Sequence, residues 1–375
     1  MTESVHAAFV ASSRQYGGEL FPGCAIKIDG QIRAFRDAGI ECDLVVVPAR
    51  RSRLAKIARR LPWTGDGVEW RRAEVSGYDA IYTRRPGVVT AQYIRWLKGL
   101  KERNPKLKIL YEIPTYPYEK EMREPKMLPF LLKDRMYRGR LKRYVDRVID
   151  LTGTTEIFGV PTLQIWNGID LQAVRARAPK ESDGRVHIMC IATFNEWHGI
   201  DRLLAGMANY QDAGGGREVV LHLVGEGPAF PALKGYVAEH GLGRHVVLHG
   251  RMAPDEFDSI YDNCHLAIEC LGNHRKGILI SSSLKSREYL AKGMPFAYSG
   301  EIDVFRDDPV DFCLRLPADE SPVDIGALLD FVDLIYSRED APELVRRIRE
   351  YAERHVSMDA AMSSVTNYLN ELSRT

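Results

Sequence analysis

Short runs of β-branched and apolar residues alternate with helix-like stretches along most of this chain of 375 residues. Such alternation is typical of parallel β-sheets whose strands are joined by crossover helices. In the first half, residues 25–38 have the pattern of a helix that ends at Gly39. The expected strands of this half are residues 5–10, 42–47, 80–83, 108–112 and 145–151, the last of which closes the series.

A second series of the same kind begins after a polar segment at residues 180–184, which we interpret as a linker. Its expected strands are residues 186–192, 219–224, 246–248 and 266–269. Its expected helices are residues 200–208, 231–240 and 255–262. The length allows two separate cores, so we predict an α/β protein with domains at residues 1–170 and 185–356. In such sheets ligands bind at the carboxyl ends of the strands.

Residues 279–296 contain the clearest indication of a binding site. A helix starts there, and its free backbone N–H groups and positive end would attract an anion such as a diphosphate. The candidate N-caps are Ser281, Ser282 and Ser283. Lys285 falls in the first turn, and Glu288, one turn later, can accept both hydrogen bonds of a ribose cis-diol. Gly293 then ends the helix. An ordinary capped helix with surface charges would show the same pattern.

Composition narrows the class of protein. The six cysteines are scattered without a Cys-x-x-Cys pair, which argues against a zinc site or a disulfide framework and favours a reducing cytoplasm. The N-terminus lacks a basic start followed by an apolar segment, and no apolar run approaches the ~18 residues of a membrane span. We therefore expect a protein that is neither exported nor integral to a membrane.

The total charge of +1 conceals a difference between the two halves. Residues 1–170 hold 30 Lys and Arg against 20 Asp and Glu, a net charge of +10, whereas residues 171–375 carry −9. The first half should therefore attract anionic partners. Residues 49–63 have six basic and no acidic residues around an apolar stripe, which is typical of a helix on an acidic membrane surface, and residues 133–147 are also basic. Core packing with solvated arginines fits the same pattern.

Four motifs follow one another in the chain. They are Trp166-Asn-Gly-Ile-Asp170, His198-Gly-Ile-Asp-Arg-Leu-Leu204, Leu223-Val-Gly-Glu-Gly-Pro228, and Glu288 followed by Lys292-Gly-Met-Pro295. In this order they resemble the retaining GT-B-fold glycosyltransferases of bacterial surface polysaccharide biosynthesis. The resemblance implies two Rossmann-like domains facing a cleft, with the acceptor on the first domain and the nucleotide-sugar donor on the second. It also implies a last helix, at about residues 357–375, that crosses back to the first domain, and no metal or cofactor.

The resemblance assigns Glu288 to the donor ribose, but other positions of the family differ here. The family's first glutamate, which contacts the transferred sugar, falls on Ile280. Its arginine and lysine, which neutralise the diphosphate, fall on Thr193 and His198. Some other cation must then stabilise the leaving diphosphate, because no metal is expected to do so.

We expect Lys285, with Arg275 or Lys276, to stabilise the diphosphate while Thr193 and His198 donate hydrogen bonds. The other expected donor-site residues are Gly18 in a glycine-rich first loop, Asn195, Gly225, Glu226, Arg251, Ser283 and Leu284. The glycines would let the backbone approach the nucleotide, although a plain tight turn also explains them. An exposed charged loop likewise explains Arg275 and Lys276.

The expected acceptor site lies in the first half. Residues 111–120 form a proline-rich aromatic loop at the end of a strand. There Tyr116 can stack on a sugar ring, and Glu112 can bind hydroxyls or assist their deprotonation. Arg84 ends another strand and is a candidate to hold an acceptor phosphate. Such loops also serve simply to pack between elements.

We therefore expect an enzyme that transfers a hexose from a nucleotide-diphosphate sugar to a hydroxyl of a glycan or lipid-linked acceptor, with retained configuration. A sugar-nucleotide epimerase of the same fold and a non-catalytic sugar-binding module remain alternatives. Nucleic-acid binding is not expected, because the basic residues lack interleaved aromatic residues. The expected location is the cytoplasm, with peripheral attachment to the inner face of the cell membrane.

Overall fold

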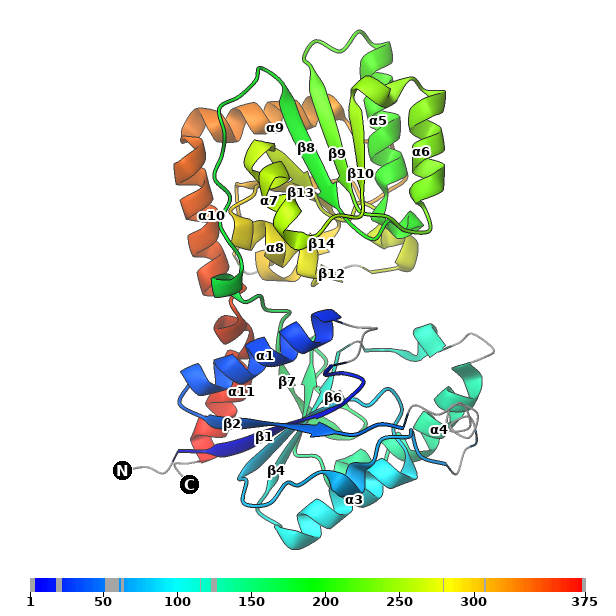
Figure 1. The fold of residues 1–375 in the computed structure, drawn as a ribbon, viewed down its shortest axis with the longest axis vertical. Helices are drawn as coiled ribbons and strands as arrows, with labels where there is room; N and C mark the ends of the chain where they lie inside the picture. Colours follow the sequence, from blue (N-terminus) through cyan, green and yellow to red (C-terminus); the bar gives the residue numbers. More distant parts are fainter. Residues whose placement is uncertain are drawn as a thin grey trace. The chain divides into compact units, whose positions relative to one another are not determined.

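The computed structural model describes residues 4–17, 22–50, 61, 64–114, 116–122, 127–278, 280–306 and 308–372. They form two compact units, each built on a mainly parallel β-sheet with helices on its faces (Figure 1). Unit 1 comprises Met1–Gly168 and Met358–Thr375, and unit 2 comprises Ile169–Ser357. The prediction of an α/β chain with two Rossmann-like sheets is confirmed.

The sheet of unit 1 has seven strands in the order β2-β1-β3-β4-β5-β7-β6. They are β1 (His6–Ser12), β2 (Glu41–Val47), β3 (Ala80–Arg84), β4 (Lys108–Ile113), β5 (Arg147–Asp150), β6 (Glu156–Ile157) and β7 (Val160–Gln164). The chain passes from β1 to β2 on one side and returns to β3 on the other. The strand order therefore reverses between β1 and β3, which is the position where sheets of this order bind ligands.

The prediction that residues 145–151 form the last strand of the first series is wrong. The short hairpin β6–β7 follows, and β7 pairs in parallel with β5. Gly159 has a φ of +77°, which allows the tight turn between β6 and β7. A two-residue strand next to a glycine carries too little apolar periodicity to be recognised in the sequence.

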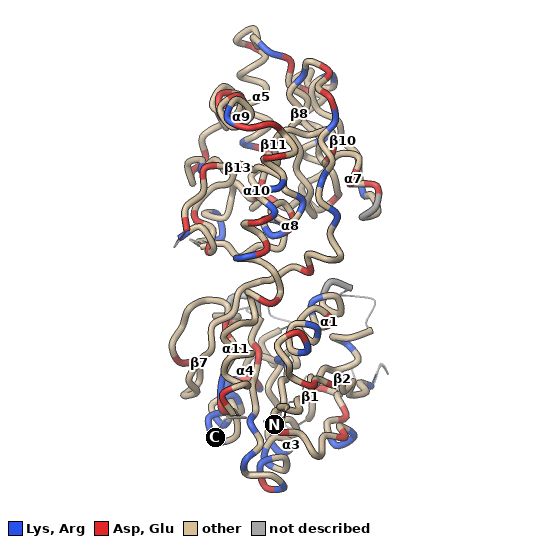
Figure 2. The backbone as a smooth tube through the Cα atoms, turned by 90° about the vertical axis from the view of Figure 1, so that its left-hand side faces the viewer, with Lys and Arg blue, Asp and Glu red and all other residues tan. Residues whose placement is uncertain are grey.

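The helices of unit 1 cover both faces of its sheet. Helices α1 (Pro22–Asp37) and α11 (Met358–Leu372) pack on one face, and α3 (Ala91–Arg103) and α4 (Leu128–Arg138) pack on the other. Figure 2 shows the basic residues along α3. Helices α1 and α11 lie so close that a Cβ at Gly30 would stand 2.9 Å from Met358 Cε. The expectation that the last helix returns to the first domain is confirmed.

The sheet of unit 2 has six strands in the order β10-β9-β8-β11-β13-β15. They are β8 (Val186–Ile191), β9 (Val219–Val224), β10 (Val246–Gly250), β11 (Leu266–Ile268), β13 (Phe296–Ser299) and β15 (Cys313–Leu316). Two short strands, β12 (Ile280–Ser281) and β14 (Glu301–Ile302), pair separately. This is the strand order of dinucleotide-binding sheets, and it reverses between β8 and β11.

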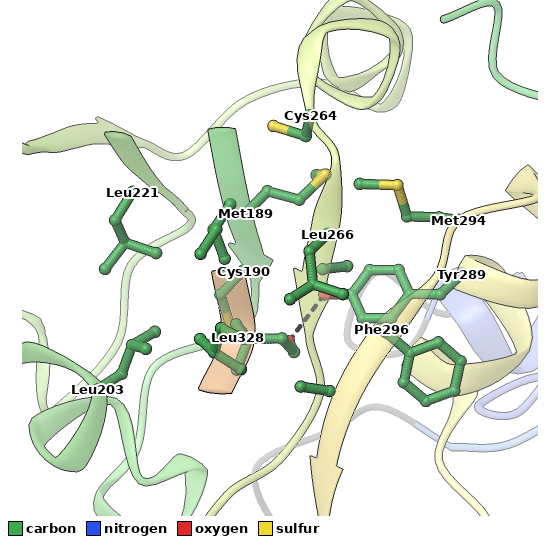
Figure 3. Packing of buried hydrophobic residues seen from close by; sticks show 14 of the residues in the cluster. Met189, Cys190, Leu203, Leu221, Cys264, Leu266, Tyr289, Met294, Phe296 and Leu328 are labelled. Atoms are coloured by element: carbon green, nitrogen blue, oxygen red, sulfur yellow. Dashed lines mark hydrogen bonds between the residues drawn. The ribbon is translucent and has the colours of Figure 1, made fainter. Parts of the chain in front are cut away.

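Helix α8 of unit 2 is anchored in the core of that unit. The helices are α5 (Ile200–Asp212), α6 (Phe230–Glu239), α7 (Pro254–Asn263), α8 (Leu284–Lys292), α9 (Ile325–Arg338) and α10 (Ala341–His355). Tyr289 of α8 packs among Leu266, Met294 and Phe296 (Figure 3). Its hydroxyl donates a hydrogen bond of 3.1 Å to the carbonyl oxygen of Ile268. A buried tyrosine needs such a partner, so this bond orients α8 against β11.

Residues 169–184 belong to unit 2, so the predicted linker at residues 180–184 is wrong. Arg177 is buried, and its guanidinium donates hydrogen bonds to the carbonyl oxygens of Gly293 at 3.1 Å and Cys264 at 2.7 Å. These carbonyls lie at the ends of α8 and α7, so the segment is held against both helices. A polar composition alone does not reveal these backbone contacts.

The basic stretch of residues 49–63 lies mostly outside the described residues, so its predicted helix stays a prediction. The second basic stretch begins within α4, which exposes an apolar stripe. Leu128, Leu132 and Met136 follow one another at intervals of four residues and are 44%, 62% and 54% exposed. Among the described residues no helix has both the length and the apolar character needed to cross a bilayer.

Three histidines contact one another across β8, β9 and β10. Nδ1 of His187 lies 2.9 Å from Nε2 of His222, and Nδ1 of His222 lies 2.9 Å from Nε2 of His249. Burial, with the two neighbouring rings, lowers the pKa of His222 to about 4, and burial also lowers the pKa of His249. These two rings are therefore uncharged at neutral pH, as a chain of N–H···N bonds requires.

Candidate active site

The loops that follow β8 and β11 meet where the strand order of unit 2 reverses. The backbone N–H of Leu271 donates to the carbonyl oxygen of His198 at 2.9 Å. A Cβ at Gly199, whose φ is +69°, would stand 2.8 Å from the backbone nitrogen of Gly272. Only glycine allows this approach, so the two loops form one surface at the carboxyl edge of the sheet.

Helix α8 begins beside this surface with Ser283 as its N-cap. The Ser283 hydroxyl oxygen accepts a 3.0 Å hydrogen bond from the N–H of Ser286 and donates a 2.6 Å bond to Glu269 Oε1. Glu269 follows β11 and is 1% exposed, so the helix start is fixed to the strand end. The predicted helix start and its end at Gly293, which has a φ of +70°, are confirmed.

Lys285 lies in the first turn of α8, with its ammonium group near Cys190 at the end of β8 and Glu269 after β11. Its Nζ is buried and has no hydrogen-bond partner. Burial lowers the pKa of Lys285, but the nearby thiol and carboxyl groups more than offset this and raise the pKa above its ordinary value. Those groups belong to Cys190, Glu269, Cys270 and Glu288. A buried charged nitrogen without a hydrogen bond is costly, which indicates that a ligand completes its environment.

His198 lies within the field of this ammonium group. Its Nδ1 accepts a 3.0 Å hydrogen bond from the backbone N–H of Asn195. Burial and the positive charge of Lys285 lower the pKa of His198 to about 4. The ring is therefore neutral at pH 7 and carries its proton on Nε2, which can donate to an anion. Thr193 is exposed on the same loop, and its carbonyl oxygen accepts a bond of 2.8 Å from Asn195 Nδ2.

Glu288 lies one turn after Lys285 on α8. Its Oε1 accepts a 2.9 Å hydrogen bond from the hydroxyl of Tyr261, and burial raises its pKa. Among the described residues Oε2 has no hydrogen-bond partner. One carboxylate oxygen is therefore held in place while the other can accept a hydroxyl, which suits recognition of a ribose.

The two predicted cations of the loop after β11 differ in their surroundings. The Arg275 guanidinium is bound to Asp201 at 2.8 Å and to Glu320 at 2.5 Å. This pairing argues against a contact between Arg275 and a diphosphate, and the predicted role of Arg275 stays a prediction. Lys276 Nζ lies 4.8 Å from the centre of the Trp197 ring and keeps its charge near the loop after β8. Its predicted donor contact stays a prediction.

The glycines after β9 are required by packing of the protein itself. A Cβ at Gly225 would stand 2.0 Å from the carbonyl oxygen of Ala192, and one at Gly227 would stand 2.3 Å from that of Phe194. The loops after β8 and β9 are thus pressed together. Glu226 and Arg251 are exposed beside them, and a nucleotide contact for any of these residues stays a prediction.

Two exposed apolar residues flank the start of α8. Ile280 is 42% exposed, and Leu284, the first residue of α8, is 55% exposed. Ile280 pairs in register with Glu301, which forms a 2.9 Å ion pair with Arg306. The structure thus places a carboxylate beside the position where the resemblance expects the family's first glutamate.

No protein-family model matches the chain, and no curated protein matches its sequence. Solved structures do match it. Sucrose-phosphate synthase from Thermosynechococcus elongatus aligns with a TM-score of 0.59 at 16% identity, over 99% of this chain and 98% of that one. The lipopolysaccharide outer core galactosyltransferase WaaB aligns with a TM-score of 0.60 at 13% identity, over 98% and 100%. Anabaena HepE, solved with UDP, aligns with a TM-score of 0.55 at 13% identity, over 98% and 100%.

These alignments extend over both units. The chain has the GT-B fold. At such identities the similarity concerns the fold alone, and the chemistry of the chain depends on its own side chains. Among the described residues no group of three or more His, Cys, Asp or Glu is placed to hold a metal ion.

In the first GT-B unit, Glu112 is unsuited to act as a base. It is 0% exposed, and its Oε1 lies 3.4 Å from Lys27 Nζ and 3.3 Å from Arg84 Nε. Its Oε2 accepts a 2.8 Å bond from the hydroxyl of Tyr82 and a 3.1 Å bond from Gln31 Nε2. Burial raises its pKa, but the two cations and two hydrogen bonds lower it to about 2. Such a carboxylate is a poor proton acceptor near pH 7, which argues against its predicted role as a base.

Arg84 and Tyr116 are also held by the protein itself. Arg84 is 9% exposed and binds Glu112, which argues against its predicted contact with an acceptor phosphate. The Tyr116 ring packs edge-on against Phe158 at 5.9 Å and Tyr118 at 6.4 Å. This packing favours the alternative that the aromatic loop packs between elements of the protein. Gly18 lies outside the described residues, so its predicted role stays a prediction.

Glu269 is the main residue of the site that the sequence interpretation missed. It orients the cap of α8 and lies near Lys285. The sequence does contain an indication of its role, because Glu269 is a carboxylate directly after an apolar strand. That strand lies where the strand order reverses. This position indicates a binding site only once the strand order is known, because most residues that follow strands face solvent.

Proposed function

We propose that this chain transfers a hexose from a nucleotide-diphosphate sugar to a hydroxyl of a glycan or lipid-linked acceptor. The observation that carries the proposal is the buried Lys285 ammonium group without a hydrogen-bond partner at the carboxyl edge of the unit 2 sheet. A diphosphate is the ligand that matches a protonated lysine, the start of a helix and a neutral histidine together.

The bound diphosphate would lie against the first turn of α8. The backbone N–H groups of Leu284 and Lys285 have no partner within the helix, because they belong to its first turn. They would share the diphosphate with Lys285 Nζ and His198 Nε2–H. Stabilising the charge that develops on the leaving diphosphate is the largest catalytic contribution open to such a site. Glu288 Oε2 would bind the ribose.

Several features of the proposal rest on the family resemblance. These are retention of configuration, independence of metal ions and polysaccharide synthesis as the setting. Structures of Anabaena HepE were solved with UDP and with UDP-glucose, so uridine diphosphate sugars are the first donors to test. We assign no covalent nucleophile.

Nucleotide sugars should raise the melting temperature of the protein selectively. A donor at 100 times its Kd adds about 2.7 kcal/mol to the free energy of unfolding. Uridine, guanosine and adenosine diphosphate sugars would be compared by thermal unfolding, with Glu288→Gln as the variant that should lose most of the shift. The bound donor would then be incubated with and without sugar acceptors, and the products would be identified. Isomerised donor without transfer would indicate an epimerase, and no shift with any donor would contradict the proposal.

We further propose that α4 attaches the protein to an acidic membrane surface. Its exposed stripe of Leu128, Leu132 and Met136 is followed by exposed Arg140, Lys142 and Arg143. Apolar side chains inserted at the headgroup level with basic side chains beside them are the elements of an interfacial helix. A lipid-linked acceptor would then be within reach of a protein that has no membrane span among its described helices.

Sedimentation with phosphatidylglycerol vesicles should recover the protein, whereas phosphatidylcholine vesicles should not. The double variant Leu132→Glu/Met136→Glu should reduce this binding at least about tenfold, because two apolar contacts become repulsive charges. Leu334→Glu on α9 is the matched control, since Leu334 is 47% exposed but lies in the other unit. Equal binding to both vesicle types, or no effect of the double variant, would contradict attachment through α4.

A further inference from the structure

A groove lined by arginines runs along α3 of unit 1. Arg95 and Arg103 lie two turns apart on this helix, about 12 Å from each other along its axis. Gly99 lies between them, and all three residues line a cavity of about 260 Å³. A Cβ at Gly99 would meet only Arg103 Nη1, at 3.6 Å. The missing side chain at Gly99 therefore keeps the space between the two arginines open.

A helical turn at Trp70–Arg72 forms another wall of this groove. Trp70 is 0% exposed, and its ring lies 4.8 Å from that of Tyr93 and 5.0 Å from that of Trp96, both on α3. Buried aromatic contacts of this kind stabilise the turn against the helix. Arg71, next to Trp70, lines the same cavity, so its backbone is held in place beside α3.

The arginines of this cavity are not neutralised by the protein. Among the described residues the side chains of Arg71 and Arg103 form no ion pair or hydrogen bond. Arg95 donates only to the carbonyl oxygen of Ala91, at 3.3 Å. Residues 51–63, which lie mostly outside the described residues, contain no aspartate or glutamate and so add no carboxylate. Three guanidinium charges therefore remain available to a ligand.

A second cavity, of about 500 Å³, adjoins the first, because Arg71 and Arg95 line both. It adds Arg50 and Arg72, which share the carboxylate of Glu69 at 2.9 Å and 3.0 Å. The described residues of the two cavities thus include five arginines and one glutamate, a net charge of +4. Like charges held together repel one another, so an anion bound here would stabilise unit 1.

The groove extends away from the edge where such a sheet binds ligands. Helix α3 follows β3 and precedes β4, and these two strands are parallel. The helix therefore begins at the carboxyl edge of the sheet and ends at its amino edge. Arg103 is the last residue of α3, whereas ligands of such sheets bind at the carboxyl edge. The groove lies wholly in unit 1, and the proposed diphosphate site at Lys285 lies in unit 2.

We infer that this groove binds an anion with two or more phosphate groups, at a site separate from the proposed donor site. Guanidinium groups bind phosphate oxygens through paired, charge-assisted hydrogen bonds. A separation of about 12 Å between Arg95 and Arg103 along the helix favours several phosphates over a single one. A soluble polyphosphate and neighbouring phospholipid headgroups both present such groups. The inference does not depend on the proposed function.

Inorganic triphosphate, titrated by calorimetry, is the probe for a soluble ligand, and sedimentation with phosphatidylglycerol vesicles is the probe for headgroups. Arg95→Gln/Arg103→Gln should weaken binding of one probe at least about tenfold through loss of charged hydrogen bonds. Lys98→Gln/Lys106→Gln is the matched control and should bind like the wild type. It removes two charges from exposed lysines on and just after α3 that do not line the groove. Triphosphate bound elsewhere, as at Lys285, adds equally to each protein.

Gly99→Leu separates a groove from a general effect of positive charge. Leucine fills the space above Gly99 without changing the charge, and replacing a glycine inside a helix should not lower stability. Gly99→Leu should therefore weaken the same probe as the double arginine variant. Weaker triphosphate binding identifies a soluble polyphosphate as the ligand, and weaker vesicle binding alone identifies headgroups. Equal binding of both probes by the arginine variant and its control, or wild-type binding by Gly99→Leu, overturns the inference.

Discussion

Replacing Lys285 with methionine should lower the rate of sugar transfer about 10²–10³-fold, the loss seen when one donor to a developing anion is removed. Methionine nearly keeps the length and apolar stem of the side chain but removes the buried ammonium group. The leaving diphosphate would then depend on the start of α8 and on His198 alone. The measurement is the release of nucleotide from saturating donor, with melting temperature recorded for each protein.

Lys234→Met is the matched control, because Lys234 is exposed on α6 of the same unit and lies outside the site. It should release nucleotide at the wild-type rate. Lys285→Arg would keep the positive charge on a larger, planar group. It should therefore retain only part of the wild-type rate. A folded Lys285→Met protein with an unchanged rate would show that the diphosphate charge is stabilised elsewhere.

Removing the Glu112 carboxylate should destabilise unit 1 by about 3–5 kcal/mol, because Lys27 and Arg84 would remain buried as uncompensated charges. Urea unfolding of Glu112→Ala against the wild type measures this loss. Glu112→Gln should be less damaging, since the amide oxygen can still accept the bond from the Tyr82 hydroxyl.

A surface pair in the same unit provides the control for Glu112. Glu102 lies 3.4 Å from Lys98, and both side chains are more than half exposed. Glu102→Ala should therefore cost no more than about 0.5 kcal/mol. If Glu112→Gln unfolded like the wild type yet lost activity more than about a hundredfold, the carboxylate would be catalytic after all.

The elements around the proposed donor site followed well from local patterns. Strand β9 has the predicted bounds, and α8 begins and ends at predicted residues. The cap, the first-turn lysine and the glutamate one turn later occupy fixed positions on a helix whatever surrounds it. Short elements such as β6, β12 and β14 were missed, because two-residue strands leave no periodicity to detect.

The roles of charged residues depended on partners far away in the chain. Arg275 looks like a candidate anion ligand in the sequence, but Asp201 and Glu320 neutralise it. Glu112 looks like a base at a strand end, but Lys27 and Arg84 surround it.

Local sequence was sufficient to predict the two α/β series and the helix that carries Lys285 and Glu288. It was also sufficient to place these two residues near the end of a strand. These features depend on neighbours within a few residues, whose spacing is set by the backbone. Tertiary structure alone decided which charges are neutralised and which stay available. An ion pair stabilises its partners only when folding brings them within a few ångströms of each other. Folding brings Arg275 to Asp201 and Glu112 to Lys27, but it leaves Lys285 Nζ without a hydrogen-bond partner.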